Sequence, residues 1–417
     1  MRHIFYLVLA AATVLSFSAC SDDDSDLDEL LAESTSSDST SDSDEDQEGD
    51  TEDEEEETIE IPDIEFDYSA LEEGTETYDS DDNDYVENSS FKNTIYFTYD
   101  GDEVTYKGDT DEVDIYEDGA HITVKSDTKS MHYVLTGSSS DGCFKIYSEN
   151  KFKLTLNGVS LTNPTGAAIN NQCGKSLYVY LADGTSNYLT DGTSYTTVSG
   201  EDMKGAFFSE GQILFSGSGT LDVTGYYKGG IVSDDYIIFR PGNIINVTTT
   251  VGNAVKANDG IYIRGGVLNI AVSGDGSKGI NSEYVVDISG GRTTIISSGA
   301  TEVVDTETTG AGGIKADTTL TMTAGALYIK SIGEGGKGIN CDYDIRLNGG
   351  ELTVVTTGDK VYSSPKGIKA DGTIYITDGT IFSYSAASDP IDATTALEIS
   401  DGYSTLTSTE RLFQISY

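Results

Sequence analysis

The residues best suited to chemistry recur inside one short phrase of the sequence. The phrase reads GIKAD at Gly313 and Gly367, and other copies read GINSE or GINCD. Successive side chains of an extended strand point to opposite faces, so Ile and Ala would point inward while Lys and Asp point outward. Outward carboxylates are calcium ligands, and outward ammonium groups bind carboxylates. The phrase therefore predicts an external row of charges.

Acids dominate the last position of the phrase. In successive copies this position holds Asp234, Asn258, Glu283, Asp317, Asp342, Asp371 and Thr394. Carboxylates stacked about 4.8 Å apart repel one another unless a cation neutralises them. Two remedies are open, namely Ca²⁺, whose flexible oxygen coordination suits such a row, or pairing with nearby lysines. The candidate metal ligands are Asp234, Glu283, Asp317, Asp342 and Asp371.

Lysines gather at two further positions of the same phrase. Six of the nine lysines after Gly219 fall there, and we call them the lysine seam: Lys256, Lys278, Lys315, Lys337, Lys366 and Lys369. One interpretation is a salt-bridge ladder that neutralises the acids, although exposed pairs contribute only about 0–1 kcal/mol each. The other is a basic stripe with embedded Ca²⁺ that holds the carboxylates of an acidic polysaccharide.

Tyrosines offer a second kind of sugar contact, since the chain has 26 Tyr and no Trp. Four of them fall at or near outward positions on one flank: Tyr262, Tyr284, Tyr343 and Tyr375. Sugar faces stack on aromatic rings, but exposed tyrosines also simply suit a pleated surface. A polysaccharide lyase would need Ca²⁺ and a lysine base, for which Lys315 or Lys369 are the candidates. Regular repetition argues against one specialised catalytic coil, so the sequence favours binding over catalysis, with a structural adhesin or scaffold as a third alternative.

The spacing of the phrase predicts the elements that position these residues. Its apolar residue recurs from Ile231 to Ile391 at spacings of 24, 25, 34, 25, 29 and 23, and fainter copies at Ile169 and Phe207 extend the series to about nine units. Each unit holds three short strands of alternating apolar residues, and Gly-x-Leu phrases separate the second from the third. Such a unit is one coil of a right-handed, single-stranded parallel β-helix, an all-β solenoid. The longer spacings predict inserted loops near 301–310 and 359–364.

Charge divides the chain into parts. The formal net charge is −48, yet residues 21–90 carry 32 acids and no Lys or Arg, so this stretch accounts for most of the excess. A segment of this composition is expected to be a disordered, extended tether. We place an N-terminal β cap at 91–141 and the carbohydrate-binding β-helix at 142–417. A polyanion repels nucleic acid, so no nucleic-acid partner is expected, and we expect a monomer.

The first twenty residues predict export. A basic start and an apolar run lead to Ser18, Ala19 and Cys20, the pattern of a signal peptide that ends in a lipobox. Cys20 would then be lipidated, although a soluble secreted protein with a chance cysteine is the alternative. The acidic tract at Asp22–Asp24 resembles the surface-export signal of Bacteroidetes lipoproteins. It implies an outer-membrane lipid anchor with the domain exposed at the cell surface.

Three stretches carry a resemblance to a known family. They are KLTLNGVSLTNPTGAAI from Lys153, SLYVYLADGTSNYLTDG from Ser176, and the serial GIKAD and Gly-Gly-x-Leu phrases. Together they resemble the carbohydrate-binding domain-containing β-helix family over roughly 95–417. That family includes a clostridial cell-surface protein that binds cellulose and acidic sugars, and its fold is related to that of pectate lyases. The resemblance implies a β-helix, bound calcium and sugar binding without proven catalysis.

Overall fold

The computed structural model describes residues 59–69, 82–400, 405–409 and 411–416. The expected leader, its Cys20 and much of the expected tether lie outside these residues. In the described part, no helix has the length and apolar character needed to cross a membrane.

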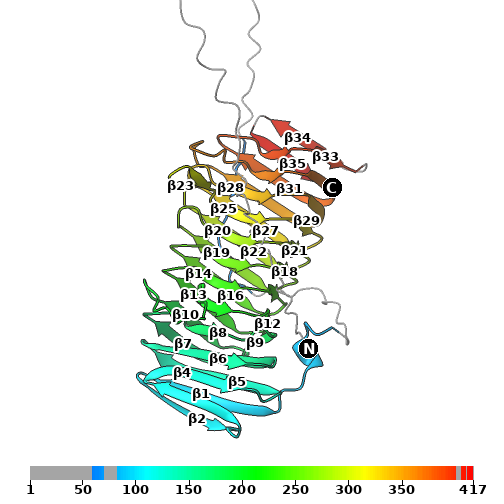
Figure 1. Ribbon diagram of the computed structural model, residues 1–417. Helices are drawn as coiled ribbons and strands as arrows, with labels where there is room; N and C mark the ends of the chain where they lie inside the picture. The colour runs from blue at the N-terminus through cyan, green and yellow to red at the C-terminus, as the bar shows by residue number, and fades with distance from the viewer. Residues whose placement is uncertain (1–58, 70–81, 401–404, 410, 417) are drawn as a thin grey trace, which may run out of the picture.

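Nearly all of the described chain forms short strands, arranged in two large sheets and one small hairpin (Figure 1). One sheet, the first face, contains β3 (Val113–Asp118), β4 (Ala120–Ser126), β6 (Gly142–Ser148), β8 (Ile169–Asn171), β11 (Gly205–Ser209), β14 (Gly229–Ser233), β17 (Val255–Ala257), β20 (Lys278–Ser282), β25 (Gly312–Ala316), β28 (Lys337–Cys341), β30 (Ile368–Ala370) and β32 (Ile391–Ala393). The other sheet contains β1 (Asn93–Asp100), β2 (Glu103–Gly108), β5 (Met131–Ser139), β7 (Phe152–Asn163), β9 (Leu177–Leu181), β10 (Ser186–Asp191), β12 (Ile213–Gly217), β13 (Thr220–Gly225), β15 (Tyr236–Phe239), β16 (Ile244–Thr249), β18 (Gly260–Ile263), β19 (Val267–Val272), β21 (Val286–Ile288), β22 (Arg292–Ser297), β26 (Leu320–Met322), β27 (Ala326–Ser331), β29 (Ile345–Thr356), β31 (Thr373–Ser385), β33 (Ala396–Ile399), β34 (Thr405–Thr409) and β35 (Leu412–Ser416). The hairpin is β23 (Glu302–Val304) with β24 (Glu307–Thr309), and one short 3-10 helix, η1, spans Val86–Asn88.

Strands of successive coils stack in parallel, which confirms the predicted right-handed parallel β-helix. The larger sheet wraps around a corner and supplies two faces. Its second face runs through β9, β12, β15, β18, β21 and β26, and its third through β10, β13, β16, β19, β22 and β27. The long strands β7, β29 and β31 take part in both faces, because each continues through the turn between them.

The number of coils is about eleven, not the nine predicted. Ten parallel pairings link eleven strands of the first face, from β4 to β32. The two additional coils begin with β4 and β6. Their inward residues, such as Ile122 and Phe144, are fully buried like those of later coils. They lack the Gly-apolar phrase, so a search for that phrase could not count them.

Antiparallel hairpins close the described ends of the solenoid. At the N-terminal end β2 pairs with β1 and β3 pairs with β4, while β35 pairs with β31 and β34 near the C-terminal end. Such pairing leaves the terminal coils without a long open edge, which would otherwise invite aggregation. The predicted insertion at 301–310 is the β23–β24 hairpin, which leaves the solenoid between β22 and β25.

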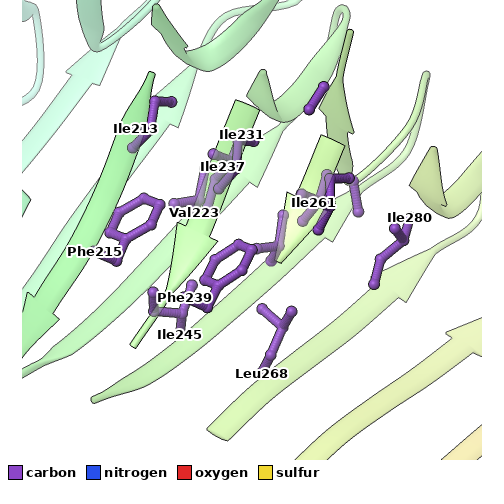
Figure 2. Packing of buried hydrophobic residues seen from close by; sticks show 14 of the residues in the cluster. Ile213, Phe215, Val223, Ile231, Ile237, Phe239, Ile245, Ile261, Leu268 and Ile280 are labelled. Carbon is purple, nitrogen blue, oxygen red and sulfur yellow. The ribbon is translucent and has the colours of Figure 1, made fainter. Parts of the chain in front are cut away.

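The core is a continuous column of apolar side chains inside the three faces. Figure 2 shows members from neighbouring coils, among them Ile213, Ile237 and Ile261, which lie in register on successive strands. Phe215 and Phe239 stack with ring centroids 5.3 Å apart and an interplanar angle of 7°. Because each coil buries its apolar residues only against its neighbours, this stacking holds the coils in register.

Glycines at the turn between the second and third faces explain the Gly-x-Leu phrase. Gly266, Gly325 and Gly350 adopt φ values of 78°, 83° and 87°, in the left-handed region. A Cβ at Gly350 would lie 2.7 Å from the carbonyl oxygen of Gly325 in the preceding coil. Both the backbone conformation and the close stacking therefore require glycine.

Candidate functional site

The first face carries the charged positions of the phrase as two columns of outward side chains. One column reads Val232, Lys256, Asn281, Lys315, Asn340, Lys369 and Asp392, in register from β14 to β32. Beside it, Lys278 of β20 and Lys337 of β28 flank Gly312 of β25. The inward apolar residue of each copy from Ile231 to Ile368 is buried, and Ile391 of the last copy is half-buried, so the alternation directs the lysines outward.

Most seam lysines form ion pairs with acids, frequently those of the next coil. Lys256 Nζ lies 2.7 Å from Glu283, and Lys315 pairs with Asp342 and lies 3.2 Å from Asp317. Lys366 pairs with Asp392, and Lys369 Nζ lies 3.4 Å from Asp371. The ladder interpretation therefore describes a large part of the seam.

Lys315 is at the centre of this ladder. Burial alone would lower the pKa of Lys315, but the hydrogen bond and charge of Asp342, together with the charge of Asp317, outweigh burial and raise it. The pKa of Asp342 is also raised, by burial and by the nearby carboxylates Asp317 and Asp371, against the opposing effect of Lys315. Asp342 therefore holds its negative charge at a cost, and Lys315 is firmly protonated.

Acids around the ladder already have cationic partners. Within the described residues, Asp202, Glu210 and Asp234 form the group whose ligand atoms all lie within 4.8 Å of one another. The ammonium of Lys204 lies 2.6 Å from Asp234 and 3.1 Å from Asp202, so two of these three acids already have a cationic partner. A resident Ca²⁺ fits poorly at either Asp234 or Asp342, because a lysine ammonium already pairs with each of them. The binding of calcium elsewhere along the row stays a prediction from the sequence.

A groove opens over the middle coils of the seam. It has a volume of about 650 Å³ and is lined by the side chains of Lys278, Lys315 and Lys337 and by Asp317, Asp342 and Asp371. Thr308 and Thr309 of β24 contribute to its wall, so the β23–β24 hairpin deepens what would otherwise be an open surface. Figure 1 shows this hairpin at the edge of the first face beside β25 and β28. We call this depression the seam groove.

Lys278 differs from the other seam lysines. Its Nζ donates to the carbonyl oxygen of Gly276 at 3.0 Å, and no carboxylate of the described chain lies within the 4.0 Å of an ion pair. The pKa of Lys278 is lowered to about 8, chiefly by burial and also by the charges of Lys315, Lys256 and Lys337, against the opposing charge of Asp317. An ammonium has three donors, so two of those on Lys278 have no hydrogen-bond partner in the described chain.

The seam groove also holds an unmatched acceptor. The buried side-chain oxygen of Asn340 has no hydrogen-bond partner, and Asn340 lines the groove one strand away from Lys315. Lys337, in contrast, donates to the hydroxyl of Ser363 at 2.6 Å. Native structures leave few buried polar groups unpaired, so an unmatched donor and acceptor in one groove indicate a place for a polar ligand.

The four predicted tyrosines occupy two different columns. Tyr262 and Tyr375 belong to one outward column of the second face, which also contains Tyr178, Leu214, Ile238, Asp287, Thr321 and Arg346. Tyr284 and Tyr343 instead lie in the turns that follow the first face, and both are exposed. Tyr343 lines the seam groove, so it is the tyrosine that the structure brings to the lysines.

Two features of the surface differ from what the sequence predicts. The spacing of the phrase predicts an inserted loop at 301–310 but not that this loop is a hairpin that walls the groove. Composition places residues 59–69 and 82–90 in the tether, yet they lie against the second and third faces through contacts such as Asp84–Arg264. The signal that could have found them is their content of Ile64, Phe66, Tyr85 and Val86, which is unusual for a purely polar linker.

Together these features define a parallel β-helix protein with a polar, cation-lined groove along one face. The family model of carbohydrate-binding domain-containing proteins matches residues 118–411, so the chain belongs to that family and the resemblance noted in the sequence is confirmed. A solved structure of a polysaccharide lyase-like protein from C. thermocellum, in a gadolinium derivative, is similar with 20% identity, a TM-score of 0.47, and coverage of 74% of this chain and 98% of that one. No curated protein matches the chain.

Proposed function

We propose that this chain binds an acidic polysaccharide in the seam groove while anchored at the outer cell surface as a lipoprotein. Membership of a carbohydrate-binding family supports the polymer class. The preference for an acidic polymer rests on the groove, because its unsatisfied groups match a uronic acid, which offers a carboxylate and hydroxyl donors on each sugar.

The observation that carries the proposal is the ammonium of Lys278. It is largely desolvated, has one hydrogen-bond partner in the protein, and lies among three other lysines. Each of these three circumstances raises the free-energy cost of its charge. A ligand carboxylate beside Nζ would relieve that cost and form a charge-assisted hydrogen bond. The oxygen of Asn340 would accept a hydrogen bond from a sugar hydroxyl. Neutral sugars could satisfy Asn340 but not the charge of Lys278.

The seam continues beyond the groove, and this extension favours a long ligand. Every coil from Lys256 to Lys369 carries a seam lysine, ion-paired with an acid in alternate coils, and neighbouring coils lie about 4.8 Å apart. A polymer lying along the stack would contact several coils at once, so each added sugar strengthens binding without a new tight pocket. Affinity should therefore increase with chain length and decrease with salt.

The proposal is tested by affinity electrophoresis in gels that contain polygalacturonate, with fully methyl-esterified polygalacturonate as the matched neutral polymer. Lys278→Met should reduce retardation by polygalacturonate. Lys107→Met, which makes the same change of charge at an exposed position of β2 away from the seam, should leave it nearly unchanged. Equal retardation by the charged and the esterified polymer would overturn the acidic preference. Retention of binding by Lys278→Met would place the site elsewhere on the surface.

A second candidate function, polysaccharide lyase, rests on the lowered pKa of Lys278. A neutral amine could accept the C5 proton of a uronate while the C4–O bond breaks, which leaves a C4–C5 double bond and a leaving oxygen protonated from solvent. Lys315 suits this role less well because its pKa is raised by Asp342. Release of unsaturated, ultraviolet-absorbing products by the wild type but not by Lys278→Met would establish the lyase.

The cellular location follows from residues outside the described part of the chain. Cys20 preceded by Ser18 and Ala19 supports lipidation, and Asp22–Asp24 support export to the surface. In intact cells of a host that exports such proteins, external protease should remove the wild-type domain. Cys20→Ala should abolish labelling by a radioactive fatty acid. Labelling that persists in this variant would refute the lipid anchor.

A further inference from the structure

A second set of cations lies on the faces away from the seam. The chain has six arginines, and three of them join Lys330 to supply one cation from each of four consecutive coils. We call this set the arginine row: Arg240, Arg264, Arg292 and Lys330. Cations on neighbouring coils repel one another, so such a row is unfavourable unless something anionic covers it.

The anion that covers the row is part of the same chain. Residues 59–69 and 82–88, here called the acidic strap, run along the stack in the direction opposite to the coils. Glu87 lies 2.9 Å from Arg240, Asp84 lies 3.0 Å from Arg264, Asp67 pairs with Arg292, and Asp63 lies 3.2 Å from Lys330. The strap therefore presents one carboxylate to the cation of each coil.

The strap is anchored at one end. Tyr85 is only 3% exposed, and its ring lies 4.5 Å from the guanidinium of Arg240. Val86 and Phe91 pack on an apolar patch of the second face that contains Tyr178, Leu214 and Ile238. This apolar contact makes the portion near η1 a stable part of the fold.

The other end, residues 59–69, is held mainly by polar contacts. The side-chain amide of Asn269 donates to the carbonyl oxygen of Asp67 at 2.9 Å, and Asp63 is 77% exposed although it pairs with Lys330. Ile64 is the one buried apolar residue of this portion. Partly exposed ion pairs contribute about 0–1 kcal/mol each, so this portion is the easier one to displace.

The strap also leaves its cationic partner incompletely matched. Arg292 pairs with Asp67 through one terminal nitrogen, while its buried Nε has no hydrogen-bond partner. The ring of Tyr328 lies 6.0 Å from the same guanidinium. A carboxylate that bound in the bidentate manner would use a second donor of this guanidinium, which Asp67 leaves unused.

We propose that the arginine row is a second binding surface for polyuronate chains, which residues 59–69 of the acidic strap occupy as an internal mimic until the polymer displaces them. A polyuronate carries one carboxylate per sugar, a spacing of the same order as the rise between coils. This surface is distinct from the seam groove, because it lies on the second and third faces while the seam lies on the first.

The test compares variants of the full-length protein on polygalacturonate at low ionic strength. Asp63→Asn with Asp67→Asn weakens the strap, whereas Asp102→Asn with Asp114→Asn makes the same change of charge at exposed acids of the first coils. An internal competitor such as residues 59–69 lowers the apparent affinity for the polymer in proportion to the fraction of time that it occupies the site. Weakening it should therefore tighten the binding of polygalacturonate about three- to tenfold. The control pair should leave the affinity unchanged. Adding Arg292→Gln to the strap variant should remove its gain in affinity.

A second readout follows the strap itself. Glu65 is exposed within the strap, so a glutamate-specific protease should cut there faster once polygalacturonate has displaced residues 59–69. Unchanged or slower cleavage, together with equal affinities of the strap variant and its control, would overturn the inference. Repeating the strap variant in a Lys278→Met background separates the two surfaces. If the strap variant still gains affinity in the Lys278→Met background, the arginine row binds the polymer even where the seam groove does not. If only Lys278→Met lowers binding and the strap variant changes nothing, the groove alone binds the polymer.

Discussion

Replacing Lys278 with Met should make the protein more stable and a weaker binder of acidic polysaccharide. A pKa lowered from 10.5 to about 8 means that folding with the charged ammonium costs about 3 kcal/mol relative to the neutral amine. Met has a similar length and no charge, so it avoids that cost. It also leaves the carbonyl oxygen of Gly276 without its donor, which costs about 1 kcal/mol.

The difference leaves a net stabilisation of about 1–2 kcal/mol, or a rise in Tm on the order of 2–5 °C, at pH 7. The stabilisation of Lys278→Met over the wild type must decrease as pH rises. The folded pKa is below the unfolded one, so the cost in the wild type is full below pH 8 and disappears as pH rises from about 8 to 10.5. The Tm difference between variant and wild type should therefore shrink over that interval.

Calorimetry of both proteins from pH 6 to pH 10 measures this difference, and affinity electrophoresis measures binding of the same samples. Lys107→Met is the control, because this lysine is exposed on β2 and lies outside the seam. A lower Tm for Lys278→Met at pH 7 would show that the ammonium is well solvated and would refute the reasoning. A higher Tm with unchanged binding would separate the buried charge from the site.

Three further outcomes are expected. Lys315→Met should lower the free energy of unfolding by about 1–2 kcal/mol in urea titrations, because it leaves Asp342 without its partner beside Asp317 and Asp371, and water screens part of that cost at a side chain that is 41% exposed. No measurable loss would contradict the central place of Lys315. Binding of polygalacturonate should weaken as pH rises from 7 to 9, since Lys278 loses its proton near pH 8, and pH-independent isotherms would exclude its charge from recognition. Removal of Ca²⁺ with a chelator should change Tm by less than about 2 °C, because Lys204 and Lys315 already neutralise the acids of the ladder; a larger drop that Ca²⁺ reverses would instead establish the calcium predicted from the sequence.

The repeating positions of this fold can be predicted from the sequence because stacking makes them periodic. Ile280, Ile314 and Ile339 lie in register and buried, as the phrase predicts, and Lys315 and Asn340 follow as outward neighbours. Periodicity cannot rank the members of a row, however. Nothing in the phrase distinguishes Lys278 from Lys337, which holds the same position, because the distinction depends on groups outside the phrase such as Ser363, to which Lys337 donates.

The acidic strap shows a second limit of the same reasoning. Its composition predicts an extended tether, and its carboxylates fit that prediction when each residue is considered alone. The arginines that hold it lie more than 150 residues later, and they are spread over separate coils. Only the stacking of those coils brings them into one row, so the complementarity becomes visible in three dimensions.

The acidity of the N-terminal region imposes a condition on any anionic ligand of this protein. Residues 21–90 supply 32 carboxylates on the same chain as the arginine row, so their effective concentration at that row is high. A short uronate oligomer must compete with them contact by contact, whereas a long polymer engages many coils together. Affinity should therefore increase steeply with oligomer length for the full-length protein and more gradually for the Asp63→Asn, Asp67→Asn variant. Calorimetric titration with galacturonate oligomers of increasing length distinguishes the two, and parallel length dependences would show that the strap does not compete.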